Sequence, residues 1–151
     1  MAAVALGIAR DAIDTFTALA RTKTPALATS TLATQHTVQE RVGRAEALLG
    51  AGRAFLYETV RALPPSPNWS EEVSDAVRAR VRLASAHAAQ SAAETVDLMF
   101  NTAGTTAIYA SSRLERCFRD VHVATQHMAV APSNIEMAGQ YFLGFGLQVR
   151  R

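Results

Sequence analysis

Residues 77–99 read VRARVRLASAHAAQSAAETVDLM and repeat apolar side chains every three or four positions. The repeating residues are Val77, Val81, Ala84, Ala88, Ala92, Val96 and Met99. This spacing places them on one face of an α-helix. Upstream, Ser70 followed by Glu71 and Glu72 is typical of a helix start, because serine caps the first amides and acids favour the positive helix end. We therefore predict a helix from about Ser70 to Phe100, roughly 45 Å long at 1.5 Å per residue.

A second long helix is predicted just before it, over residues 35–63. Its apolar stripe comprises Val38, Val42, Ala45, Leu49, Gly52, Leu56 and Val60. Pro64 and Pro65 stop this helix, because proline lacks an amide hydrogen and clashes with the preceding turn. Two helices of this length can brace each other in an antiparallel pair.

Three shorter helices complete the expected fold. The first covers residues 2–20, where Val4, Ile8, Ala12, Phe16 and Leu19 form an apolar stripe, and residues 21–34 form an irregular connection. After a turn at residues 101–106, Ser111 or Ser112 caps a fourth helix, and residues 131–133 separate it from a last helix that ends near residues 144–146. The prediction is all-α: one domain, residues 1–151, forming an antiparallel four-helix bundle with a short extra C-terminal helix.

Composition excludes several classes of function. The formal charge is +2, from 15 basic and 13 acidic residues mixed along the chain, so no nucleic-acid footprint is evident. No uncharged apolar run reaches the length of about 18 residues that a membrane-spanning helix needs. Cys117 has no partner for a disulfide, and no CxxC spacing suggests structural zinc. We expect a cytoplasmic protein that binds no metal, nucleic acid or membrane.

Ionisable chemistry is concentrated in the segment RDVHVATQH, residues 119–127. His122 and His127 are five residues apart, about 500° around a helix, so they cannot bind one metal ion from a regular helix. Glu115 with Arg119 has the spacing of a helix-stabilising ion pair. His127 lies just before the break at Pro132, where a side chain can face a cleft. Two interpretations of His127 follow: a packing residue, or a group that transfers protons near neutral pH.

The same segment resembles the end of the C-terminal helical domain of acyl-CoA dehydrogenases, and specifically their two-component flavin-dependent monooxygenase branch. In the dehydrogenases, a turn similar to residues 100–104 and an Arg-Asp pair similar to Arg119-Asp120 precede a catalytic glutamate. Here Gln126, His127 and Met128 occupy the neighbourhood of that glutamate, and the next acid is Glu136. Removal of a proton from an acyl thioester needs a carboxylate base, so this departure favours the monooxygenase branch, which has histidine instead.

The resemblance implies a cofactor and a set of site residues. A flavin, FMN or FAD, would be reduced by a separate reductase and would then carry the redox chemistry with oxygen. His127 is the implied catalytic residue, and Gly104, Thr105 and Gln126 are the implied cofactor contacts, with no metal. The family also implies a homo-oligomer, a dimer or a tetramer.

The N-terminal helical domain and the middle β-domain of that family have no counterpart in this sequence, which shows no strand-like alternation. The chain would then be a fragment, a truncated product or one half of a split enzyme with a β-domain partner, and we expect no turnover from it alone. Two alternatives remain open. The chain is an acyl-CoA dehydrogenase-like fragment, or it is a non-catalytic, self-associating helical module that docks through its first helix.

Overall fold

The computed structural model describes residues 1–63 and 73–147. In chain order the helices are α1 (Ala2–Thr22), α2 (His36–Arg61), α3 (Asp75–Ala103), α4 (Arg113–Thr125) and α5 (Ser133–Phe142). Two short 3-10 helices, η1 (Leu32–Thr34) and η2 (Gly104–Ala107), lie in the connections. The described residues contain no β-strand. The predicted class, an all-helical bundle with a short extra C-terminal helix, is confirmed.

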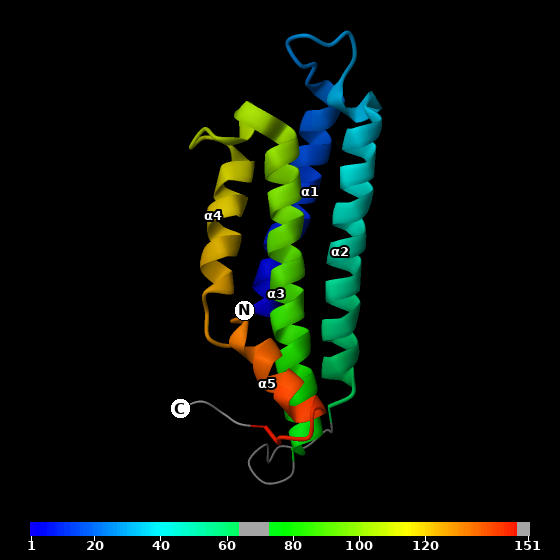
Figure 1. Cartoon of the computed structure of the whole chain (residues 1–151). Coiled ribbons are helices and arrows are strands. Elements are labelled where there is room, and N and C mark those ends of the chain that lie inside the picture. Colours follow the sequence, from blue (N-terminus) through cyan, green and yellow to red (C-terminus); the bar gives the residue numbers. More distant parts are fainter. Residues whose placement is uncertain (64–72, 148–151) are drawn as a thin grey trace.

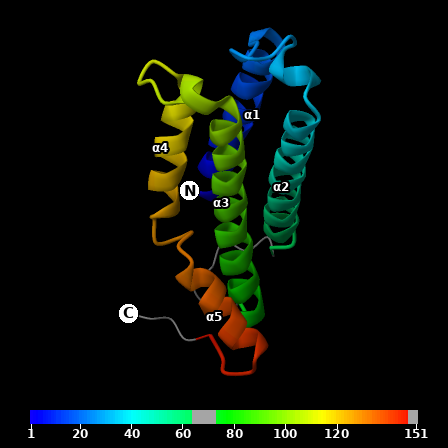
Figure 2. The same ribbon diagram turned by 45° about the horizontal axis from the view of Figure 1, so that its top comes forward.

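Figure 1 shows α1 to α4 running alternately up and down, with α5 crossing the lower end of α3. Helix α3 contacts each of the other four helices, and α1 contacts α2, α3 and α4. Within the described residues α2 and α4 make no contact, so they lie on opposite sides of the α1–α3 pair. The view in Figure 2 shows the same order from a second direction, with α5 lying along the lower end of α3.

The core lies where α3 and α1 face each other, and small residues allow this close approach. Buried positions on α3 include Ala84, Ala88, Ala92, Val96 and Met99, as the sequence pattern predicted, whereas Val77 and Val81 of the same stripe are only half-buried. On α1, however, Val4 is exposed, and the buried positions include Ala5, Ala9 and Phe16. The expected stripe was partly wrong because alanines, and not the larger Val4, occupy the contact positions. The apolar face of α1 is therefore largely used inside the bundle, which leaves less of it for docking than expected.

Both ends of α3 differ from the prediction. Helix α3 begins at Asp75, where the hydroxyl of Ser74 accepts a 3.5 Å hydrogen bond from the Val77 amide, so Val73 precedes the helix. The expected cap at Ser70 falls outside the described residues. At its other end α3 continues through Ala103 and stops at Gly104, whose φ of 63° favours glycine. The Lys23 ammonium donates to the Ala103 carbonyl oxygen at 2.7 Å and satisfies one terminal acceptor.

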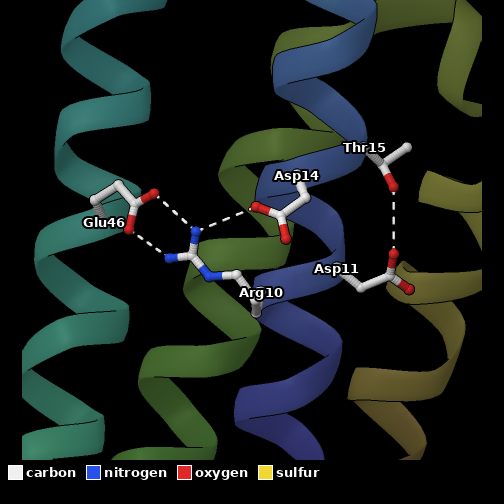
Figure 3. A network of polar contacts seen from close by, with 5 residues as sticks. All are labelled: Arg10, Asp11, Asp14, Thr15 and Glu46. Carbon is white, nitrogen blue, oxygen red and sulfur yellow. Dashed lines mark hydrogen bonds and ion pairs between the residues drawn. The ribbon is translucent and has the colours of Figure 1, made fainter.

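Ion pairs join α1 to α2 on one side and to α4 on the other, and Figure 3 shows the pairs made by Arg10. The Arg10 guanidinium donates to both carboxylate oxygens of Glu46 on α2 and to Asp14 within α1. Arg113 on α4 donates from Nε to Asp11 at 2.7 Å. These hydrogen bonds lower the pKa of the Glu46 and Asp11 carboxyls. The stabilisation is therefore present at neutral pH and is lost as the pH falls through those lowered values.

Gly52 lies where α2 approaches α3 closely, and this close approach supports a first prediction. A Cβ atom at Gly52 would lie 3.1 Å from Cβ of Ser91 on α3, whereas a Cβ at Gly43 on the same helix would meet nothing within 4 Å. We expect Gly52→Val to lower the free energy of unfolding by about 1–3 kcal/mol through overpacking. Gly43→Ala should raise it by up to about 1 kcal/mol, because alanine favours the helix. Urea denaturation measures both, and equal effects would contradict this packing.

Candidate functional site

Helix α4 ends at Thr125, and His127, the candidate catalytic residue, lies in the turn that follows. The amides of Gln126 and His127 donate to carbonyl oxygens three residues back, at 3.1 and 3.3 Å, so the α-helical spacing is already broken. His127 is exposed, and its Nδ1 accepts a 3.1 Å hydrogen bond from the Ala129 amide. A neutral imidazole that accepts at Nδ1 carries its proton on Nε2. His127 therefore presents Nε2 as the ring nitrogen that can exchange a proton with a ligand.

An open groove of about 340 Å³ lies beside this turn, between α3 and the link from α4 to α5. Its lining residues are Gln90, Ala93, Glu94, Asp97, Thr125, Gln126, Val130 and Pro132. The lining thus combines a small apolar wall, two amide side chains and two acids. Gln126 is the predicted site residue that lies in the groove, and His127 follows it directly in the chain.

Asp97, which lines this groove, forms an ionisable pair with His122. His122 Nε2 lies 2.8 Å from Asp97 Oδ1, which joins α4 to α3. The His122 ring packs edge-on against Phe118, with centroids 4.7 Å apart, and Phe118 stacks on Phe100 at 4.5 Å. The sequence analysis considered His122 only as a metal ligand and missed this pair. The spacing of Phe118 and His122, four residues apart on one helix face, was the available signal.

The predicted cofactor contacts lie at two separate places. Gln126 and His127 follow the end of α4, whereas Gly104 and Thr105 lie in η2, just before α4 begins. Helix α4 has 13 residues, so the two places are about 20 Å apart at the helical rise per residue. One flavin ring cannot touch both places within a single chain. All four residues are exposed, and their roles stay predictions.

The groove residues fit one part of a flavin. Ala93 and Pro132 offer a small apolar surface for a flat ring, and the amide of Gln126 can meet the polar edge of that ring. Glu94 and Asp97 oppose the negative charge of a phosphate, although Arg44 pairs with Glu94 at 2.8 Å. These residues therefore suit a neutral heterocycle, while phosphate groups would need cationic contacts outside this groove.

The single cysteine does not form a competing nucleophilic site. Cys117 is buried, and this burial raises the pKa of its thiol to about 11, with the nearby Asp11 carboxylate adding to the effect. The thiol stays protonated at neutral pH and is a poor nucleophile. Residues 1–63 and 73–147 contain no cluster of three potential metal ligands. Among these residues, no helix combines the length and the apolar character needed to cross a bilayer.

The fold and this site together define a helical domain with an open groove beside the turn that follows α4. Residues 1–132 match the family model described as the C-terminal domain of acyl-CoA dehydrogenase. The chain belongs to this family, as the sequence resemblance indicated.

Known relatives place the chain more closely within the family. It is 35% identical over 144 residues to an indole-3-acetate monooxygenase of Pseudomonas putida, and 29% identical over 150 residues to one of Acinetobacter baumannii. These alignments cover 95% and 96% of this chain but only 37% of each relative, so the chain spans little more than a third of their length. XiaF from Streptomyces, solved with FADH2 and glycerol, superposes on 99% of this chain with a TM-score of 0.88 at 22% identity. That chain is likewise covered only to 38%.

Proposed function

We propose that this chain acts as the C-terminal helical domain of a flavin-dependent monooxygenase that hydroxylates an aromatic substrate. The observation that carries this proposal is the 35% identity to an indole-3-acetate monooxygenase across 95% of the chain. Indole-3-acetate, or another aromatic acid of similar size, is the substrate class that this similarity supports. The FADH2 bound in XiaF favours FAD over FMN as the cofactor.

His127 is the residue that we propose for the chemistry. Its Nδ1 is held by the Ala129 amide, so its Nε2 is available to give or take a proton. An imidazole can do both near neutral pH. Acyl-CoA dehydrogenation is disfavoured as an alternative, because the turn at residues 126–132 carries no carboxylate: Asp120 precedes it on α4, and Glu136 follows it on α5. The two acids of the groove are both paired, Glu94 with Arg44 and Asp97 with His122. When bound, the flavin would supply the activation of oxygen, and Gln126 would contact the ring edge.

The open surface around His127 supports a site that further domains complete. Val123 and Met128 flank the turn and are 73% and 83% exposed, and the groove beside them is open to solvent. Catalysis depends on holding groups rigidly and on excluding water. We therefore propose that the chain does not turn over alone. It works with the remaining two domains of its family, as a homo-oligomer, with a separate flavin reductase.

A chimera tests this function. In it, this chain replaces the matching segment of the Pseudomonas putida relative, and circular dichroism verifies that the product is folded. We expect the chimera to bind FAD and, with reduced flavin and oxygen, to hydroxylate indole-3-acetate, whereas the isolated 151-residue chain does neither. A folded chimera that binds no flavin would refute the proposal. Hydroxylation by the isolated chain would contradict the need for further domains.

A further inference from the structure

Asn134, at the start of α5, is a polar side chain sealed inside the protein. It is only 1% exposed, and it is one of four buried polar residues within the described ranges. Its Oδ1 accepts a 2.9 Å hydrogen bond from Nη1 of Arg82 on α3. Its Nδ2 donates to the carbonyl oxygens of Met128, at 2.8 Å, and Ala131, at 3.1 Å. The side-chain amide thus joins α3 to the turn between α4 and α5, and the Ala131 carbonyl also accepts from the Asn134 backbone amide at 3.0 Å.

Both carbonyls belong to the turn that carries His127. Met128 is the next residue in the chain, and Ala131 closes the turn before Pro132. Between these two anchored carbonyls lies Ala129, whose amide donates to His127 Nδ1. A continuous series of hydrogen bonds therefore leads from α3 through Arg82 and Asn134 to the turn, and from the turn to the imidazole.

Only an amide can make these bonds in this orientation. Aspartate would keep the acceptor for Arg82 but would lose both donors, and leucine would lose every contact at similar volume. Burial of a polar side chain costs free energy unless its donors and acceptors are paired. The paired amide of Asn134 therefore fixes where the turn lies relative to α3. Thr95, by contrast, is equally buried, but its hydroxyl donates to Ser91 within the same helix, at 2.8 Å, and fixes no second element.

We propose that Asn134 and Arg82 are positioning residues that hold the turn at residues 126–132 and thereby orient the His127 ring. Neither residue touches the reacting atoms; they act through the backbone of Met128 and Ala131. The meaning of this role for catalysis rests on the proposed monooxygenase function. The placement of the ring itself does not, and it is measurable in the isolated chain.

The test uses nuclear magnetic resonance on the full 151-residue chain. Protonation of His127 removes its Nδ1 acceptor, so in the native protein the Ala129 amide resonance should shift with the titration of that ring. In Asn134→Ala we expect this linked shift to vanish and the exchange of the Ala129 amide with solvent to quicken roughly fivefold to tenfold, as for one lost hydrogen bond. Thr95→Val, which also removes a buried polar group but far from the turn in the sequence, should leave both signals unchanged.

Arg82→Gln provides a second variant if Asn134→Ala does not fold. Arg82 is only partly buried, so its replacement opens no closed cavity. We expect it to weaken the same two signals. If the Ala129 shift and exchange rate are native in either folded variant, the proposal is overturned. A chimera that fails to hydroxylate, combined with a lost Ala129 signal in these variants, would refute the proposed function and leave the positioning role standing.

Discussion

Replacing His127 by alanine in the chimera should slow hydroxylation by about 10²–10⁴-fold, the range typical for loss of a general acid or base, and should lower the yield of product. The structure gives the reason: His127 is the titratable side chain in the exposed turn after α4, and its Nε2 can transfer a proton. Without it, reduced flavin should still consume oxygen but release hydrogen peroxide unproductively. Product yield and peroxide release, measured together against oxygen consumed, check this expectation.

The same substitution should leave the fold intact. His127 is exposed and makes one hydrogen bond within its own turn, so its loss should cost less than about 1 kcal/mol. His36→Ala is the matched control, because His36 is also exposed but lies at the start of α2. If the His127→Ala chimera hydroxylates at full yield, His127 is not the catalytic residue.

Phe16→Ala should cause the largest loss of stability, about 3–5 kcal/mol, which is typical for an aromatic residue removed from a core. Among the described residues, Phe16 is the largest side chain that is fully buried, with 0% exposure. It belongs to a core cluster that is rich in alanines, such as Ala9, Ala92 and Ala103. These short side chains cannot move to fill the cavity, so little of the lost energy is recovered by collapse of the site.

Urea denaturation of the isolated chain measures this loss. A small domain is stable by only about 5–15 kcal/mol, so the variant should unfold at a much lower urea concentration. Phe142→Ala is the matched control, because Phe142 is 63% exposed at the end of α5. If the two substitutions cost the same, Phe16 does not hold the core together.

Most of the fold could be predicted because each helix carries a local pattern. The stripe from Ala84 to Met99 and the break at Pro132 are visible in a few turns of sequence. Helix boundaries were less predictable. Val4 proved exposed, because the packing of neighbouring helices, and not local hydrophobicity, selects which apolar residues are buried. Helix α3 began at Asp75, where Ser74 caps it. Within the candidate site, His127 does lie near a helix end, but α4 ends at Thr125, before His127, and not at the break near Pro132 that the sequence predicted.

The remaining parts of the site come from distant segments of the chain. Asp97 and His122 are 25 residues apart, and Arg82 and Asn134 are 52 apart. The sequence around each of these residues does not indicate which distant residue it will contact. The resemblance to the family also did not predict that Gly104 and Thr105 lie far from Gln126, because this separation depends on the continuous helix α4 between them.

The amino-acid sequence by itself determined the helical class, the order of the helices and the presence of a histidine at the turn after the fourth helix. These properties depend on side-chain spacing over one to a few helical turns, which any amphipathic segment encodes locally. Only the tertiary structure decided which residues surround that histidine and how its ring is held. Hydrogen bonds between α3, the turn and α5 form when the bundle brings their distant segments together, and no local pattern specifies that encounter.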